Sequence, residues 1–213
     1  MQEAQHNLTT TITKEVELDY LLYVPEEAPA DPPPLMLFLH GAGERGNDLS
    51  LVKKNGPPRE IENGAELPFV MLAPQCPPGV WWQVDSLVAL LDDFTDQHEV
   101  DERRIYVSGL SMGGYGTWAL ADACPGRFAA LAPVCGPFTY VNSDSFVNTP
   151  VWCFHGAMDE VVPVDNSIRM VRWLRESGAD VRFTIYPDAG HDSWTQAYAG
   201  TELYDWLLEH GRS

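Results

Sequence analysis

The feature that most constrains this chain is an apolar segment that stops at the motif Gly-x-Ser-x-Gly. Residues 105–121 read IYVSGLSMGGYGTWALA, which predicts a strand, a one-residue elbow and a helix. This is the context in which the motif presents a nucleophile. Gly109 and Gly113 remove side chains where strand and helix approach, so Ser111 is expected on a strained backbone with its hydroxyl exposed. We predict Ser111 as the nucleophile and interpret Ser108 as a buried strand residue.

The charge of the chain excludes some classes of partner. The 213 residues suit one domain and are 45% hydrophobic, but 31 acidic residues face 13 Lys and Arg, for a formal charge of −18. Such a surface repels phosphate backbones and anionic headgroups, so we expect no nucleic-acid partner. No stretch approaches the roughly 20 apolar residues of a membrane span. We therefore also expect no membrane insertion.

The alternation of apolar segments predicts an α/β fold. Residues 15–24 alternate as a half-buried edge strand does. Buried strands are expected at 35–39, 69–73, 105–110, 130–134, 151–154 and 181–186, and helices at 49–53, 86–97, 113–123, 164–176 and 201–210. Buried strands that alternate with helices indicate a mostly parallel sheet with helices on both faces. The predicted fold class is therefore α/β.

The predicted organisation is one domain, residues 15–213, after an N-terminal extension, residues 1–14. The extension has no basic and apolar pattern of a secretory leader. The protein is therefore expected to be cytoplasmic, or secreted with a leader or neighbouring domain removed. The sequence predicts no oligomeric state.

The partners of Ser111 are expected in loops at the carboxyl ends of other strands, where parallel sheets collect their functional residues. Asp159 follows one predicted strand and His191 follows the last one. The order Ser, Asp, His is that of an α/β-hydrolase triad, in which His191 takes the serine proton and Asp159 orients the imidazole. Three other acids near these positions remain alternatives for the acid, and we prefer Asp159 to them; they are Glu160, Asp188 and Asp192.

The tetrahedral intermediate of such a reaction needs two backbone N–H donors. Met112 directly follows the nucleophile, and we predict its N–H as the first donor. The segment His-Gly-Ala-Gly follows the strand at 35–39, and we predict Ala42 as the second.

The histidines and cysteines of the chain show no spacing typical of a zinc site. His40 and His155 each precede a glycine at a strand end, and we interpret both as structural residues bonded to loop backbone. The cysteines contain no C-x-x-C pair and are interpreted as buried free thiols, although a disulfide remains possible; they are Cys76, Cys124, Cys135 and Cys153. We predict no metal and no cofactor.

Four motifs together resemble a known family. They are Gly109 to Gly116 (GLSMGGYG), His40 to Gly46 (HGAGERG), Ala73 to Pro77 (APQCP) and Tyr186 to Trp194 (YPDAGHDSW). As a set they resemble α/β-hydrolases of the phospholipase/carboxylesterase type, and more narrowly bacterial esterases labelled "predicted peptidases". The resemblance implies hydrolysis of carboxylic esters by a Ser-Asp-His triad at Ser111, Asp159 and His191, without a metal. Members also occur as modules of larger secreted, carbohydrate-active proteins.

The substrate is expected to enter an open cleft. The interval from Gly136 to Pro150, where such folds often insert a lid, is too short for a helical cap. Among the loop aromatics we predict Trp82 and Trp194 as substrate contacts, with packing beneath loops as the alternative for each. Trp81, Phe138 and Tyr140 lie on the same predicted loops.

The predicted function is a serine carboxylesterase for short-acyl esters. The alternative is an acetyl or feruloyl esterase on plant polysaccharide, which exposed aromatic residues near the cleft would favour. A peptidase is disfavoured, because amide cleavage needs a tighter substrate clamp than a lidless chain offers. An inactive hydrolase fold used only for binding is disfavoured by the complete set Ser111, Asp159 and His191.

Overall fold

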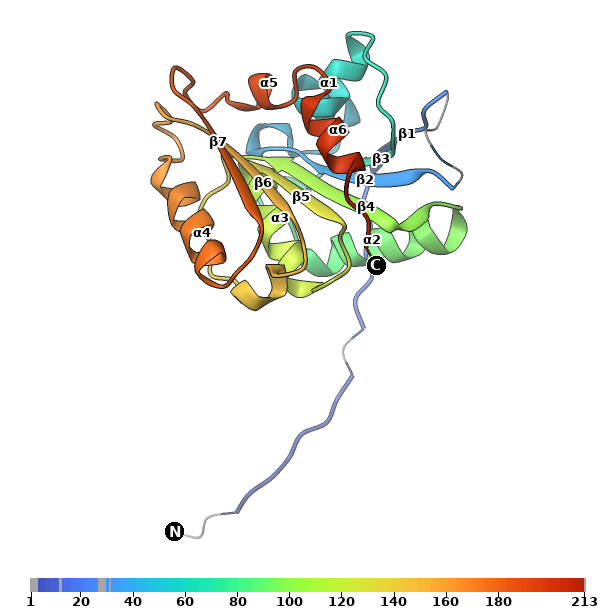
Figure 1. The fold of residues 1–213 in the computed structure, drawn as a ribbon. Helices are drawn as coiled ribbons and strands as arrows, with labels where there is room; N and C mark the ends of the chain where they lie inside the picture. Colours follow the sequence, from blue (N-terminus) through green and yellow to red (C-terminus); the bar gives the residue numbers. More distant parts are fainter. Residues whose placement is uncertain (1–3, 12, 27–29, 31, 213) are drawn as a thin grey trace.

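The computed structural model describes residues 4–11, 13–26, 30 and 32–212. Their centre is one seven-stranded sheet, in the order β1-β3-β2-β4-β5-β6-β7 (Figure 1). The strands are β1 (Tyr20–Tyr23), β2 (Pro34–Leu39), β3 (Val70–Pro74), β4 (Asp101–Leu110), β5 (Ala130–Val134), β6 (Val151–Gly156) and β7 (Val181–Tyr186). β1 runs antiparallel to β3, and every other pairing is parallel. The predicted α/β-hydrolase architecture is confirmed.

The strand order reverses between β2 and β4, and this reversal fixes where the loops gather. The chain builds β3 on one side of β2, and from β4 onward it adds strands on the other side. The loops that follow β2 and β4 therefore diverge at their carboxyl ends, which leaves the crevice where open α/β sheets place their sites. The elbow at Ser111 and the segment around Ala42 both begin there.

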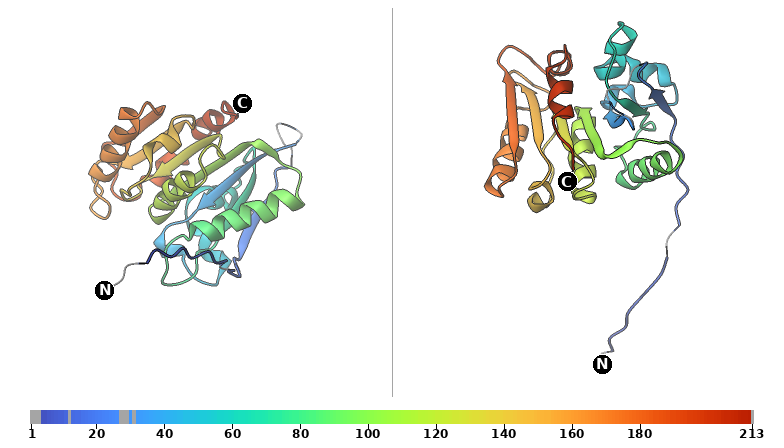
Figure 2. Two further views of the ribbon diagram at one scale, coloured as in Figure 1. Left: turned by 90° about the horizontal axis from the view of Figure 1, so that it is seen from below. Right: turned by 45° about the vertical axis from the view of Figure 1, so that its right-hand side comes forward.

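Helices cover both faces of the sheet (Figures 1 and 2). α2 (Val84–Gln97), α3 (Met112–Ala123) and α4 (Asp165–Glu176) cover one face, and α1 (Gly56–Glu62), α5 (Trp194–Ala197) and α6 (Glu202–Leu208) cover the other. β2 contacts both layers, because Leu35, Leu37 and Leu39 pack in the first core while Met36 and Phe38 pack in the second. This two-sided burial explains the unbroken apolar segments of the central strands.

The first strand is shorter than its sequence pattern suggests. Alternation predicts a strand over 15–24, but β1 covers Tyr20–Tyr23 only. Tyr20 packs against the first core and Tyr23 against the second, whereas Leu22 is 42% exposed and Val24 is 67% exposed. The predicted edge position is confirmed, but the predicted buried face through Val24 is wrong, because the core beneath the strand ends before Leu22 and Val24.

The described residues before β1 contain no helix or strand, and their trace leads away from the domain in both figures. The Lys14 ammonium lies 2.7 Å from a carboxylate oxygen of Asp85 on α2. The boundary between extension and domain at 14/15 remains a prediction. In the part of the chain that the structure describes, no helix has the length and apolar character needed to cross a membrane.

Two short helices near the site escaped the sequence prediction. The segment expected to be helical at 49–53 is a 3-10 helix, η2 (Leu49–Lys54), and α1 follows it at once. α1 begins Gly56-Pro57-Pro58, a pattern that resembles a loop, yet proline suits the first helical turn because its missing N–H would have no partner there. α5 is the second, and it follows the predicted catalytic histidine.

Candidate active site

Ser111 occupies a strained elbow between β4 and α3. Its φ is 53° and its ψ is −113°, and its backbone N–H donates to the Val134 carbonyl at 2.8 Å. Glycine is required on both sides. A Cβ on Gly113 would overlap the Leu39 carbonyl, and a Cβ on Gly109 would lie 2.8 Å from the same oxygen. A non-glycine residue at positive φ persists only where its surroundings impose it, and such residues cluster at functional sites.

Ser108, the rival serine, lies inside the sheet. Its side chain is fully buried, and its hydroxyl donates to the Ala132 carbonyl at 2.7 Å. The Tyr198 hydroxyl lies 2.8 Å from Ser108 Oγ and is its second hydrogen-bond partner. The prediction that Ser108 is a buried strand residue is confirmed.

Three loops bring the predicted triad residues together. His191 Nε2 lies 2.9 Å from Ser111 Oγ, and His191 Nδ1 lies 2.7 Å from Asp159 Oδ2. Ser111 follows β4, Asp159 follows β6 and His191 follows β7. These distances allow a proton to pass from the hydroxyl to the imidazole while the carboxylate holds the other ring nitrogen.

The Asp159 carboxylate is buried but well supplied with donors. Its side chain is 0% exposed, and Oδ1 accepts from the backbone N–H groups of Val161 and Val162 at 2.9 and 2.8 Å. A buried carboxylate is tolerated only with such partners. The other acids considered at this position do not share the environment, since Glu160, Asp188 and Asp192 are all exposed.

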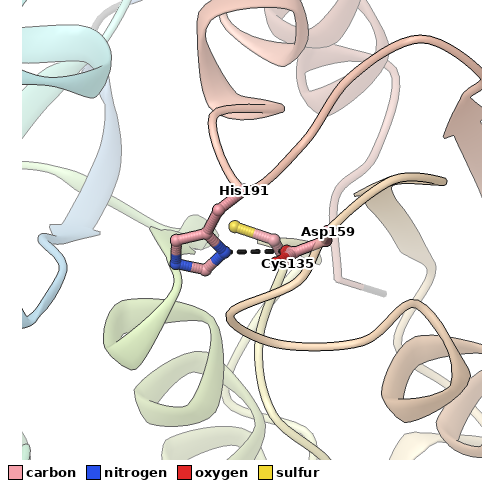
Figure 3. A group of neighbouring side chains, drawn as sticks. All are labelled: Cys135, Asp159 and His191. Atoms are coloured by element: carbon pink, nitrogen blue, oxygen red, sulfur yellow. Dashed lines mark hydrogen bonds and ion pairs between the residues drawn. The ribbon is translucent and has the colours of Figure 1, made fainter.

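Cys135 is a third group beside the acid and the histidine (Figure 3). Its sulfur lies within 4.8 Å of the ligand atoms of Asp159 and His191, a donor set that zinc accepts. Burial raises the pKa of the Cys135 thiol to about 12, which opposes the thiolate that a metal needs. Two ligands of a tetrahedral zinc lie about 3.3 Å apart, wider than the 2.7 Å between Asp159 Oδ2 and His191 Nδ1. The separation is that of a hydrogen bond.

The predicted oxyanion donors belong to backbone that flanks Ser111. Met112 is the first residue of α3, where the N–H groups have no acceptor within the helix. Ala42 begins the 3-10 helix η1 (Ala42–Glu44) after β2. The preceding Gly41 lies against the elbow, since a Cβ placed on it would lie 3.6 Å from the Ser111 Cβ.

The two histidines that precede glycines are both buried and bonded to backbone. His40 Nδ1 lies 2.6 Å from the Gly41 carbonyl oxygen, and Nε2 accepts from the Cys76 N–H at 2.9 Å. His155 Nε2 lies 2.8 Å from the Val162 carbonyl oxygen and 3.2 Å from Asp159 Oδ2. Their interpretation as residues bonded to loop backbone is confirmed, and each lies next to a component of the site.

Trp82 does not line an open surface. It is 4% exposed, packs against the His40 ring at a centroid distance of 4.8 Å, and donates from Nε1 to the His40 carbonyl at 3.1 Å. The predicted substrate contact at Trp82 is therefore wrong, because the indole is part of the core beneath the β2 loop. Its neighbour Trp81 is 49% exposed and packs edge-on against Tyr115 of α3.

Trp194, the other predicted contact, lies beside His191, the predicted catalytic base. Its ring meets that of His191 edge to face at 5.2 Å, and its Nε1 donates to Asn55 Oδ1 at 3.3 Å. The Asn55 amide in turn donates to Glu44 Oε1 at 2.8 Å. This chain joins the β2 loop to the β7 loop. Sequence reasoning missed Glu44 and Asn55, and the only signal was the presence of Glu44 in the HGAGERG segment.

Comparison with known proteins places this geometry in a family. Residues 79–200, more than half of the chain, match the family described as "Dienelactone hydrolase family". A solved thermostable esterase superposes with a TM-score of 0.79 at 35% identity, over 92% of this chain and 60% of that one.

Curated relatives carry esterase names. A bifunctional acetylxylan esterase/xylanase of Neocallimastix patriciarum is 26% identical over 200 residues, which are 88% of this chain and 28% of the relative. "Probable feruloyl esterase C" of Aspergillus oryzae is 25% identical over 90% of this chain and 74% of its own length. This chain thus spans less than a third of the first relative. The predicted α/β-hydrolase relationship and esterase class agree with these matches, and the chain belongs to the dienelactone hydrolase family.

Proposed function

We propose that this chain is a serine carboxylesterase that hydrolyses short-acyl carboxylic esters through an acyl-enzyme. The observation that carries the proposal is the pair of hydrogen bonds that links Ser111, His191 and Asp159 across three loops, with Ser111 on a strained elbow. Family membership and the names of the relatives support the same class of reaction.

In the acylation step, Ser111 Oγ attacks the ester carbonyl carbon while His191 Nε2 takes its proton. The 2.9 Å separation suits that transfer. His191 then returns the proton to the departing alcohol, and the acyl group remains on Ser111. Asp159 keeps the imidazole in the tautomer with its proton on Nδ1 and stabilises the imidazolium during the step.

The carbonyl oxygen becomes negative in the tetrahedral intermediate. We assign its stabilisation to the N–H groups of Met112 and Ala42. Met112 contributes a free N–H at the start of α3, where the helix dipole also favours negative charge. In deacylation, water takes the place of the alcohol, His191 activates it, and the acid is released.

The entrance to the site favours small or polymer-borne esters. The segment 136–150, all of it described, contains one 3-10 turn, η3 (Ser143–Phe146), and no helical lid. Without a lid there is no apolar cover to hold a long acyl chain away from water. We therefore expect activity to decline as the acyl chain lengthens.

The test is release of p-nitrophenol from acetate, butyrate and longer esters by the wild type and by Ser111→Ala. We expect wild-type turnover of the short esters and a loss of about 10⁴-fold or more in the variant. Equal rates in the two proteins would refute the role of Ser111. A preference for long chains would refute the short-acyl assignment.

A second candidate, an acetyl or feruloyl esterase on polysaccharide, is favoured by a surface aromatic cluster in which Tyr140 is exposed and Phe138 and Trp173 are half-buried. Tyr140 is 81% exposed and meets both other rings edge-on, at 5.3 and 5.9 Å. The loop that carries Phe138 and Tyr140 follows β5 and passes beside the start of α3, where Gly136 lies against Gly114. Adjoining aromatic rings on the surface are a candidate binding surface for a sugar polymer.

Acetylated xylan and soluble feruloyl esters discriminate the two candidates. If the cluster binds polymer, Tyr140→Ala lowers kcat/KM on acetylated xylan by about 10-fold, the range of one lost aromatic contact, and lowers it far less on p-nitrophenyl acetate. Equal losses on the two substrates, or no wild-type activity on acetylated xylan or on the feruloyl esters, would remove this candidate and leave the small-ester assignment.

A further inference from the structure

The dipeptide His-Gly directly follows strand β2 and ends strand β6, and a fixed backbone hydrogen-bond partner decides which tautomer each histidine holds. Cys76 offers His40 a backbone N–H, which can only donate, so His40 Nε2 is the acceptor and the ring proton lies on Nδ1. That proton is donated to the Gly41 carbonyl at 2.6 Å.

The ring of His40 thereby fixes the orientation of the Gly41–Ala42 peptide. A trans peptide is planar, so its C=O and N–H point in opposite directions. When Nδ1 holds the Gly41 oxygen, the Ala42 N–H is directed away from the ring. The Trp82 indole packs against the imidazole and donates from Nε1 to the His40 carbonyl, so the ring has little freedom to turn.

His155 has the opposite arrangement. Its Nε2 faces the Val162 carbonyl, which can only accept, so the ring proton lies on Nε2 and Asp159 Oδ2 is a second acceptor at 3.2 Å. Nδ1 is left to accept from the Ser167 hydroxyl at 2.7 Å. Burial lowers the pKa of both histidines, that of His40 to about 4, so both rings are neutral near pH 7.

We propose that His40 and His155 are a pair of positioning residues that act through opposite ring nitrogens. His40 uses Nδ1–H to aim the oxyanion peptide at the elbow, and His155 uses Nε2–H to hold the acid Asp159 and the loop that donates to it. Val162 is the shared point, because its N–H donates to Asp159 Oδ1 and its carbonyl accepts from His155. The inference rests on the proposed esterase function.

The test exploits amide side chains that mimic one ring nitrogen each. The amide of Asn occupies the position of Nδ1, and that of Gln reaches the position of Nε2. His40→Asn keeps the donor to Gly41 and loses the acceptor for Cys76, whereas His40→Gln does the reverse. For His155 the amide of Gln reaches Val162 and Asp159, and that of Asn does not.

We expect opposite orders of rescue in kcat on p-nitrophenyl acetate. His40→Asn and His155→Gln retain kcat within about 3-fold of the wild type, while His40→Gln and His155→Asn lose about 10- to 100-fold, the range below complete loss of one oxyanion donor. KM stays within about 3-fold in all four, since the affected groups act on the transition state. Urea unfolding of each variant establishes that the measured protein is folded.

The same order of rescue at both histidines, or losses that follow unfolding stability instead of the mimicked nitrogen, would overturn the proposal. A second measurement needs no activity. Nitrogen chemical shifts of the imidazoles should show His40 protonated on Nδ1 and His155 on Nε2, and a shared tautomer would also overturn it. If the wild type hydrolyses no ester, the proposed function fails while the tautomer measurement still decides the geometry.

Discussion

The two sides of the site use different groups of the chain: the acid–base side consists of side chains, and the predicted oxyanion side consists of backbone N–H groups. On the acid–base side, Asp159 and His191 meet Ser111 through side-chain hydrogen bonds of 2.7 and 2.9 Å. On the oxyanion side, the predicted donors are backbone groups of Met112 and Ala42. We propose that the buried His40 ring orients the Ala42 donor, and glycines let β2 approach the elbow that carries Met112.

This difference predicts which property a substitution on each side will change. A side chain can be exchanged for a near-isostere that keeps the fold and removes the chemistry. A backbone donor remains after every side-chain substitution except proline, which also constrains φ, so we test it here through what orients it. We therefore expect substitutions on the acid–base side to change turnover at constant stability, and substitutions on the oxyanion side to change stability as well.

The largest effect is expected on the acid–base side, from Asp159→Asn. The amide can leave His191 in the wrong tautomer, with no proton acceptor facing Ser111, so kcat on p-nitrophenyl acetate should fall by about 10⁴-fold while the fold persists. Asp188→Asn is the matched control, because Asp188 is exposed on the same loop as His191. It should stay within about 2-fold, and the reverse outcome would move the role of the acid to Asp188.

The next effect tests the approach of β2 to the elbow. An added Cβ at Gly113 would overlap the Leu39 carbonyl, so Gly113→Ala should lower the free energy of unfolding by about 3 kcal/mol or more. Gly43→Ala is the control on the same loop system, since nothing lies within 4 Å of a Cβ there. Urea unfolding should place it within about 0.5 kcal/mol of the wild type. Equal losses of unfolding free energy in the two variants would mean that the close approach of β2 does not require glycine at position 113.

A smaller effect concerns pH and His40. Burial lowers the pKa of His40 in the folded protein to about 4, below its ordinary value of 6.5. As the pH falls below 6.5, the unfolded chain takes up this proton before the folded one does, so stability is lost between about pH 6.5 and pH 4. The loss from pH 7.5 to pH 5 should be about 2 kcal/mol, and His40→Asn should lack it.

Urea titrations of the wild type and His40→Asn at several pH values measure this difference directly. Other titrating groups, including His155, are common to the two proteins and cancel in the comparison. Parallel pH profiles would mean that His40 is not held neutral by the fold, and would weaken its assigned place on the oxyanion side.

The smallest effect is expected from metal chelation. Asp159 and His191 are at hydrogen-bond distance, and the Cys135 thiol resists ionisation. Dialysis against EDTA should therefore leave kcat/KM unchanged, with restoration by Zn²⁺ as the control. A loss that zinc reverses would show that the Cys135, Asp159 and His191 group binds a metal in the working protein.

The acid–base side was also the more predictable from sequence. The order of Ser111, Asp159 and His191 at successive strand ends follows from apolar periodicity and the rule that functional loops gather at the carboxyl edge. The prediction for Trp82 failed because a loop position does not reveal burial, and here the indole packs beneath the loop on His40. The amino-acid composition predicts neither the triad order nor the burial of Trp82.

Other features depended on contacts between distant residues. Asn55 and Trp194 are hydrogen-bonded although 139 positions separate them, and no local pattern announces such a contact. α1 was missed because two prolines resemble a loop signal, while their place in a first helical turn depends on where the helix begins. The tautomers of the two histidines were equally inaccessible, because they depend on how Cys76 from another loop meets His40 and on how the β6 loop folds Val162 back onto His155.

The most direct test of the account is covalent labelling of the intact protein with an alkyl fluorophosphonate, followed by peptide mass spectrometry. The account predicts one adduct, on the peptide that contains Ser111, with labelling slowed strongly in His191→Ala and absent in Ser111→Ala. An unlabelled wild type, or an adduct on any other residue, would contradict the claim that Ser111 is the activated nucleophile.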